Sequence, residues 1–354
     1  MIALLRILPI IVVVFGLPYI EVKADGPAIG TAYSVSKILN PGDTFMGITL
    51  RGALRVNPQK LNGLEPRELS GMAWDADENR LYALSDDGHI VHLRPHIADN
   101  VLVGLDYLDA YSLRDAAKIA LVPELGDAEG LVAYNTRNGV QADSSLLISF
   151  GEHARIDRYL PDGTFLEPVS LPSALTGRNS SKDDRLELEA ISEHPLHGLV
   201  AIPESPLKGT PKGKFTVHNF EEKVWEFSPL DAKYSAVVGM ESMQNGDLLL
   251  LERRYSSVFK PVIFALRRLV LPSDDRQAQV SEEIVHFNSK RGWKIDNFES
   301  VARHEGNRYF VISDDNENPI QKTLLLYFEI ISDGPASVDL AQDVSTLPTS
   351  RLGL

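Results

Sequence analysis

The most constraining feature of this sequence is a phrase that recurs five times along the chain. Each copy begins with a glutamate and a short apolar stretch, passes through a polar turn into a second apolar stretch, and ends in acidic residues. The leading glutamates are Glu68, Glu129, Glu189, Glu241 and Glu299, at intervals of 61, 60, 52 and 58 residues. Such a period is too long for a helical solenoid and is typical of four-stranded propeller blades with long loops.

The segments within each repeat are typical of β-strands, because they are rich in β-branched and aromatic residues and are bounded by turn-forming residues. A short helix is an alternative only within 106–122. We therefore predict an all-β fold, a single β-propeller. Dividing the chain length by the period gives six blades, and the sixth would combine strands at Thr44–Val56 with a C-terminal strand, so that N- and C-terminal strands close the ring. A stack of β-sandwich domains is the alternative, but the linkers rich in Pro, Gly and Ser that it predicts are not evident.

The first 24 residues are typical of a secretory signal peptide. Arg6 precedes an apolar stretch at 7–20, and 22–24 carries small residues at both positions that define a cleavage site. At about 1.5 Å per residue, this stretch is too short to cross roughly 30 Å of hydrocarbon. We therefore expect residues 25–354 to form one propeller domain without a membrane span, in the periplasm or outside the cell.

Charge and composition exclude several classes of protein. The chain has 35 Lys and Arg against 49 Asp and Glu, a net charge of −14. Nucleic-acid binding requires clustered basic residues, so we expect no nucleic-acid partner. The absence of Cys excludes disulfides, thiolate zinc sites and thiol nucleophiles. The sequence also lacks a serine nucleophile elbow, a zinc-protease helix motif and a phosphate-binding Walker loop.

The recurrent carboxylates predict a cation site. The innermost strands of a propeller line a central channel, so equivalent positions of the repeats form a ring at one mouth. Crowded like charges require neutralisation, and oxygen ligands favour hard cations, so we expect Ca²⁺ there, with Mg²⁺ or Mn²⁺ as alternatives. The predicted ligands are Glu68, Asp86, Glu129, Glu189, Glu241, Glu299, Asp314 and Asp315. Other acidic residues expected near this mouth are Asp87, Glu152, Glu204 and Glu252.

A purely structural role for these glutamates is the alternative. A buried glutamate at a strand start can accept backbone N–H groups and pair with arginine, which would hold neighbouring blades together. The arginines available for such pairs are Arg67, Arg80, Arg253, Arg254 and Arg308.

Three residues are candidates for catalysis. Glu252 and Arg253 lie at the predicted mouth, where a guanidinium group would clamp a phosphate or a carboxylate. Consecutive side chains of a strand point to opposite faces, so only one of Arg253 and Arg254 faces the channel, and we favour Arg253. His153 adjoins Glu152 and would form an acid–base pair with it, although a solvated loop histidine is the simpler alternative.

At these repeats the chain resembles the phytase-like family, which is also described as the "esterase-like activity of phytase" domain. The resemblance extends from about 61 to 330. The segments that carry it are 69–72, 82–87, 127–131, 188–191, 249–255, 297–301 and, most specifically, 312–316 with 321–325.

The resemblance implies a secreted or periplasmic propeller with phytase or esterase activity. Propeller phytases bind several Ca²⁺ ions and hydrolyse phosphomonoesters with a metal-activated water, so the ring carboxylates of this chain would hold Ca²⁺. Few Lys residues lie near the predicted mouth, whereas a substrate as rich in phosphate as phytate would favour several there.

We therefore expect a cation-assisted hydrolase whose partner is a small anionic ester of phosphate or carboxylate, or a metal complex of such an ester. One alternative is a non-catalytic, Ca²⁺-stabilised propeller that binds a ligand or an envelope protein. Another is a lactonase-type hydrolase with a single channel metal.

Overall fold

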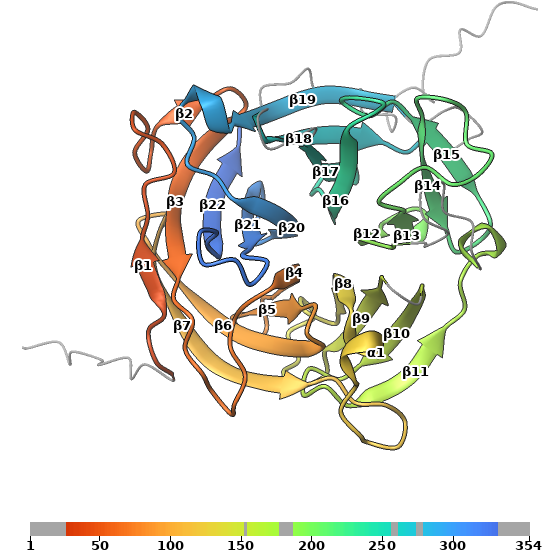
Figure 1. Cartoon of the computed structure of the whole chain (residues 1–354), viewed down its shortest axis with the longest axis horizontal. Helices are drawn as coiled ribbons and strands as arrows, with labels where there is room; N and C mark the ends of the chain where they lie inside the picture. The colour runs from red at the N-terminus through yellow and green to blue at the C-terminus, as the bar shows by residue number, and fades with distance from the viewer. Residues whose placement is uncertain (1–25, 152–153, 177–186, 256–260, 274–278, 332–354) are drawn as a thin grey trace, which may run out of the picture.

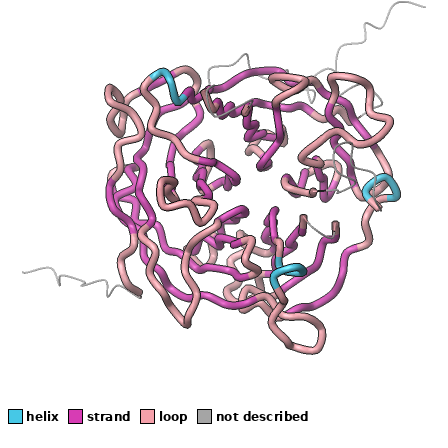
Figure 2. Tube along the Cα trace, in the orientation of Figure 1, coloured by secondary structure: helices cyan, strands magenta, loops and turns pink. Residues whose placement is uncertain are grey.

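Five β-sheets stand around a central channel in the computed structural model (Figure 1). The structure describes residues 26–151, 154–176, 187–255, 261–273 and 279–331. The first strand of each repeat lies at the channel, and strands account for nearly all regular structure in the described chain (Figure 2). No helix in these ranges is long and apolar enough to cross a membrane. The fold is thus all-β, a single propeller whose blades are the five sheets.

Four blades are each built from four consecutive antiparallel strands, which follow one another from the channel outward. The first blade contains β4 (Leu69–Asp75), β5 (Arg80–Ser85), β6 (His89–Ala98) and β7 (Val101–Ser112). The second contains β8 (Ala128–Tyr134), β9 (Ser145–Phe150), β10 (Arg155–Tyr159) and β11 (Phe165–Val169). The third contains β12 (Ala190–His194), β13 (Gly198–Ile202), β14 (Phe215–Asn219) and β15 (Val224–Phe227). The fourth contains β16 (Ser235–Ser242), β17 (Leu248–Arg254), β18 (Ile263–Val270) and β19 (Gln279–Asn288).

The fifth blade combines strands from distant parts of the chain. From the channel outward it contains β20 (Asn297–Arg303), β21 (Arg308–Asp314), β22 (Leu324–Ile330), β3 (Ile48–Val56) and β1 (Gly30–Ala32), with β2 (Thr44–Phe45) also paired to β3. The helical turns are α1 (Pro123–Gly126), η1 (Ser173–Leu175) and η2 (Ser289–Arg291). β3 and β22 are antiparallel, and the Arg51 guanidinium group pairs with the Glu329 carboxylate across them.

The prediction of six blades is wrong. The strands expected at Thr44–Val56 do form, as β2 and β3, but β3 pairs with β22 in the fifth blade. The fifth repeat supplies only β20, β21 and β22, so the N-terminal strand fills an outer position rather than starting a blade. No sixth sheet is present in the described ranges. The number six arose because dividing the chain length by the repeat period assigns the N-terminal strands at 44–56 to a blade of their own.

The hydrophobic core lies between neighbouring blades. In β17, Leu249 and Leu251 pack with residues of the fifth blade, whereas Leu248 and Leu250 pack with residues of the third. A sheet that is covered on both faces requires apolar side chains at every position rather than at alternate ones. This requirement explains the uninterrupted run of four leucines, 248–251, in β17.

We expect Leu250→Ala to lower the free energy of unfolding by about 2–5 kcal/mol, because deleting a buried side chain leaves a cavity. Leu250 is 0% exposed. Urea unfolding followed by circular dichroism measures the effect. The control is Ile38→Ala, which removes a side chain that is 82% exposed and should change stability by less than about 0.5 kcal/mol. Equal effects of the two substitutions would contradict the packing of β17 between its neighbours.

Candidate metal centre

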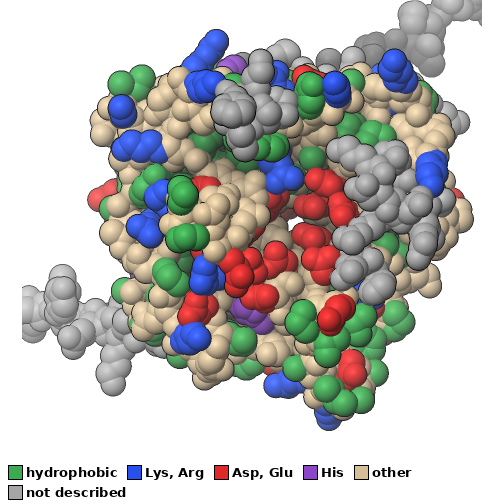
Figure 3. All heavy atoms as spheres, in the orientation of Figure 1, with side chains coloured by type: hydrophobic (Ala, Val, Ile, Leu, Met, Phe, Trp, Pro, Cys, Tyr) green, Lys and Arg blue, Asp and Glu red, His purple; other side chains and the backbone are tan. Residues whose placement is uncertain are grey.

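Acidic side chains gather around one mouth of the channel (Figure 3). The start of each inner strand lies beside the end of the second strand, because the two are antiparallel. Leading glutamates therefore meet the acidic residues that follow the second strands. We call this cluster the acidic mouth. Its carboxylates belong to Glu68, Asp86, Asp87, Asp127, Glu129, Glu187, Glu189, Glu204, Glu299, Asp314 and Asp315.

The inner strands approach one another closely at the acidic mouth. A Cβ atom on Gly71 would lie 2.8 Å from the Glu129 carbonyl oxygen, and one on Gly130 would lie 2.9 Å from the Glu189 carbonyl oxygen. Only glycine permits such an approach between two backbones. Glu129 and Glu299 also lie at β-bulges, where an extra residue changes the direction of the side chains. Glycines and bulges together bring carboxylates of neighbouring blades to one place.

Among the described residues, two groups of three carboxylates are close enough to hold a cation. Within each group, one oxygen from each residue lies within 4.8 Å of the others. The groups are Glu68, Asp86 and Asp87, and Glu187, Glu189 and Glu204. All of these ligand atoms are oxygens, the type that Ca²⁺ prefers.

Gly151 leaves room for two of the carboxylates. A Cβ atom at this position would lie 2.8 Å from Asp127 Oδ2 and 2.8 Å from Glu129 Oε1. The Gly151 backbone N–H donates to the Asp127 carbonyl oxygen at 2.9 Å, which fixes the glycine against this segment. Any larger residue would displace the two side chains.

Burial and mutual repulsion raise the pKa of three carboxyls of the acidic mouth, those of Glu68, Asp86 and Glu129. Burial, followed by the charge of Asp87, raises the pKa of Glu68 to about 7. Burial, followed by the charge of Glu68, raises the pKa of Asp86 to about 9. Burial, followed by the charge of Asp127, raises the pKa of Glu129 to about 8. Without a cation, part of the acidic mouth is therefore protonated at neutral pH.

Arg253 partly neutralises the acidic mouth. Its Nη1 atom donates to Glu299 Oε1 at 2.6 Å and to Asn297 Oδ1 at 2.9 Å, and its Nη2 atom donates to Glu204 Oε1 at 3.4 Å. These contacts join the fourth blade to the fifth and the third. Nevertheless, burial is the largest influence on Glu299, and its pKa remains raised, to about 7.

Three buried carboxylate oxygens of the acidic mouth, Asp86 Oδ1, Glu299 Oε2 and Asp315 Oδ1, have no hydrogen-bond partner among the described residues. Glu299 is only 9% exposed. Leaving a buried acceptor unsatisfied is unfavourable, and a coordinated cation would satisfy it. The unsatisfied oxygens and the all-oxygen groups fit a hard divalent cation such as Ca²⁺.

A pocket of about 770 Å³ adjoins the acidic mouth. It shares Glu204 and Arg253 with the mouth, and Lys233, Asn297 and Gln321 also line it. The two cationic side chains and the amides can donate hydrogen bonds to an anion, beside carboxylates that are suited to a cation. An anionic molecule in this pocket would therefore adjoin the candidate metal centre.

Seven predicted ligands lie in the acidic mouth, and these are Glu68, Asp86, Glu129, Glu189, Glu299, Asp314 and Asp315. Asp315 has a cationic partner, since its Oδ2 atom lies 3.5 Å from Arg67 Nε. His153 and Glu152, the predicted acid–base pair, lie outside the described residues.

Glu241 does not join the other leading glutamates, so its predicted place in the ring is wrong. Its carboxylate accepts the backbone N–H of Ser242 at 2.8 Å and that of Arg303 at 3.1 Å, at the far ends of β16 and β20. Val238 occupies the bulge of β16 that corresponds to Glu299 in β20. Sequence spacing alone matched Glu241 to the wrong end of its strand.

Glu252 is buried within the fourth blade rather than at the mouth. It is 0% exposed, its Oε2 atom lies 2.5 Å from Arg267 Nη1, and it also accepts the backbone N–H of Leu230. Side chains alternate along β17, so Glu252 lies on the face toward the third blade, whereas Arg253 lies on the face toward the fifth blade and contacts the acidic mouth. The geometry of Glu252 is that of an ion pair between β17 and β18.

Two members of the acidic mouth, Asp127 and Glu187, are neither among the ligands that the sequence predicts nor among the other acidic residues expected near the mouth. Each lies two residues before a leading glutamate, namely Glu129 and Glu189. Residues two apart in an extended chain share a face, so a search for acidic pairs at this spacing would find both. Lys233 is remote from the repeat motif, and no local signal places it beside the mouth.

Comparison with known protein families identifies one match, to the family named Phytase-like and described as "Esterase-like activity of phytase". The match covers residues 67–317, more than two thirds of the chain. Comparison with curated proteins finds no match.

Among solved structures, one similar chain is the extracellular domain of BT4673 from B. thetaiotaomicron, at 13% sequence identity and a TM-score of 0.33. The similarity covers 79% of the present chain and 30% of the other. At this TM-score it supports no argument about fold or function.

We expect the cation-free protein to lose stability as the pH rises from about 6.5, above which the buried histidines are neutral in both states, to about 9. Glu68, Asp86 and Glu129 have higher pKa values in the folded chain than in the unfolded chain. The folded state therefore binds more protons and is destabilised as these groups ionise. Melting temperatures in chelator, at constant ionic strength, should fall across this range, and saturating Ca²⁺ should flatten the dependence. A rise with pH in chelator would contradict the assignment.

Proposed function

Because this chain belongs to the phytase-like family, we propose that it is an exported hydrolase that cleaves small phosphate or carboxylate esters with the help of divalent cations. The observation that carries the proposal is the joining of the acidic mouth to a pocket lined by Arg253 and Lys233. Sites for a cation and for an anion then lie side by side, as cation-assisted hydrolysis of an anionic ester requires.

The cations would be held by the two carboxylate groups of the acidic mouth. Glu68 and Asp86 belong to one group, and Glu189 and Glu204 belong to the other. Bound Ca²⁺ would supply Lewis acidity, which polarises the ester oxygen and lowers the pKa of water. Mg²⁺ and Mn²⁺ are alternatives, because both also accept oxygen ligands.

Side chains of the adjoining pocket would orient the substrate. Arg253 presents a planar guanidinium group that is suited to two oxygens of a phosphate or a carboxylate, and Lys233 adds a second cation. Glu299, which has a pKa of about 7, can accept a proton at Oε2, the atom without a partner among the described residues. Arg253 positions this carboxyl through Oε1.

Export is part of the proposal and rests on residues 1–24, which have the order of a secretory signal but lie outside the described residues. The alternative of a lactonase with a single channel metal is less well supported, because the part of the chain that the structure describes contains two separate carboxylate groups rather than one. A non-catalytic propeller that binds Ca²⁺ for stability is the remaining alternative, and turnover assays combined with calorimetry distinguish it.

We expect the purified protein to hydrolyse p-nitrophenyl phosphate or p-nitrophenyl acetate in Ca²⁺ and to lose this activity in chelator. Glu189→Gln should lower kcat/KM at least about tenfold, since even residues that only orient a metal ligand have effects of that size. The control is Glu167→Gln. Glu167 lies on β11, the outermost strand of the second blade, and its carboxylate pairs with Arg158 of β10. Absence of turnover with Ca²⁺, Mg²⁺ and Mn²⁺ on both substrates would refute the hydrolase.

Ca²⁺ should also raise the melting temperature, whether or not the protein is an enzyme. Ligand at about 100 times its dissociation constant stabilises the folded state by about 2.7 kcal/mol. Glu189→Gln should reduce this shift and Glu167→Gln should preserve it, as measured by differential scanning calorimetry. A shift without turnover would support the non-catalytic alternative, and no shift at any Ca²⁺ concentration would refute the metal centre itself.

A further inference from the structure

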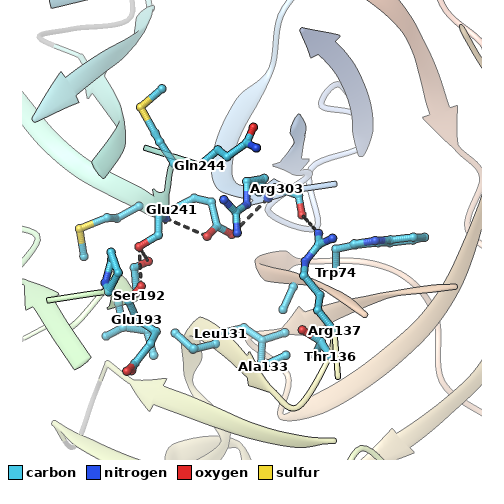
Figure 4. Close-up of a pocket in the computed structure, with 17 residues that line it drawn as sticks. Trp74, Leu131, Ala133, Thr136, Arg137, Ser192, Glu193, Glu241, Gln244 and Arg303 are labelled. Carbon is cyan, nitrogen blue, oxygen red and sulfur yellow. Dashed lines mark hydrogen bonds between the residues drawn. The ribbon is translucent and has the colours of Figure 1, made fainter. Parts of the chain in front are cut away.

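The opposite mouth of the channel contains a second pocket, of about 370 Å³ (Figure 4). The inner strands begin at the acidic mouth, and this pocket lies at their far ends. Its lining includes Trp74 of β4, Ala133 of β8, Glu193 of β12, Glu241 of β16 and Arg303 of β20. All five blades therefore contribute, although the proposed hydrolase uses none of these residues.

Two guanidinium groups, those of Arg137 and Arg303, line one side of this pocket (Figure 4). Arg137 follows β8 and is held by the backbone, since its Nη2 atom donates to the carbonyl oxygens of His304 and Arg303. The Arg303 guanidinium group has no hydrogen-bond or ion-pair partner within the described ranges. The structure thus fixes one guanidinium group and leaves the donors of the other unused.

The charge on this side of the pocket favours an anion. Glu241 is the acidic residue beside the two arginines, and its oxygens already accept the backbone N–H groups of Ser242 and Arg303. The second glutamate of the lining, Glu193, lies across the pocket from the arginines, where its carboxylate accepts a hydrogen bond from the Tyr134 hydroxyl group (Figure 4). The excess positive charge is therefore local to the side that carries the two arginines. In support, burial and then the like charge of Arg303 lower the pKa of the Arg137 guanidinium group. A bound anion would relieve this repulsion.

The other residues that line this pocket indicate the chemistry of the rest of the ligand. Leu131, Ala133 and Met240 provide apolar surface. The Gln244 amide lies beside Arg303 and makes no hydrogen bond within the described ranges, so it can donate to an anion (Figure 4). The nearby charge of Glu241 opposes a dianion more strongly than a monoanion. These features together favour a small monocarboxylate with an apolar tail over inorganic phosphate.

We propose that this second pocket binds the carboxylate of a small organic acid, with Arg303 and Gln244 as donors and the apolar tail against Leu131 and Met240. Arg137 adds positive charge from its fixed position. The inference is independent of hydrolysis at the acidic mouth, because the two sites lie at opposite ends of the inner strands.

Isothermal titration calorimetry with butyrate tests the proposal. The protein is kept in chelator, so that no cation at the acidic mouth can bind the carboxylate. We expect butyrate to bind more tightly than inorganic phosphate, and its neutral analogue butyramide not to bind. Arg303→Gln should weaken butyrate binding about tenfold or more, because a charge-assisted hydrogen bond is lost.

The matched control is Arg291→Gln, which makes the same charge change at a surface turn, η2. It should leave butyrate affinity unchanged. Gln244→Ala provides a second test if Arg303→Gln proves unstable, because Gln244 is exposed in a turn, and it should also weaken binding. No binding of butyrate, equal binding by the wild type and Arg303→Gln, or tighter binding of phosphate would each overturn the proposal.

Discussion

The structure depends on the burial of both faces of every blade. A sheet with two apolar faces is stable only between two similar sheets, and a ring satisfies this condition for all five blades at once. The alternating destinations of Leu249 and Leu250 in β17 show the arrangement at single residues. The ring then dictates where polar groups can go, because the inner strands converge on one channel. The two mouths of that channel are the places where side chains from every blade meet.

The acidic mouth forms because the inner strands converge, and the repulsion among its carboxylates opposes that convergence. Packing sheets together buries Glu129, Glu189 and Glu299 close to other carboxylates, so that burial first and repulsion from neighbouring carboxylates second raise their pKa values. Arg253 offsets part of the repulsion through its contacts with Glu299 and Glu204. The fourth blade thus supplies a guanidinium group where the other blades supply carboxylates. The fold itself thus concentrates negative charge at this mouth. A cation that binds there would hold together all the blades that provide its ligands.

Local patterns in the sequence predict much of the fold and less of the site. Repeated apolar runs predict an all-β propeller, and regular spacing places Glu68, Glu129, Glu189 and Glu299 at one mouth. The blade count fails because strand pairing between β3 and β22 leaves no local signal. Glu241 is misplaced because a spacing of 52 residues does not reveal how far β16 extends before its glutamate. The alternation of side chains along β17 is sufficient to separate Glu252 from Arg253.

The pairing of β3 with β22 has a consequence for the order of folding. Arg51 and Glu329, which join these strands, are 278 residues apart in sequence. The outer position of the fifth blade therefore stays empty until nearly the whole chain has been synthesised, and contacts of such high sequence separation form slowly. Until then, β3 presents the edge that β22 later covers, and another chain can occupy that edge. The ring of blades is therefore completed by the last strands of the chain to be made, and a chain that ends before β22 would lack the partner of β3.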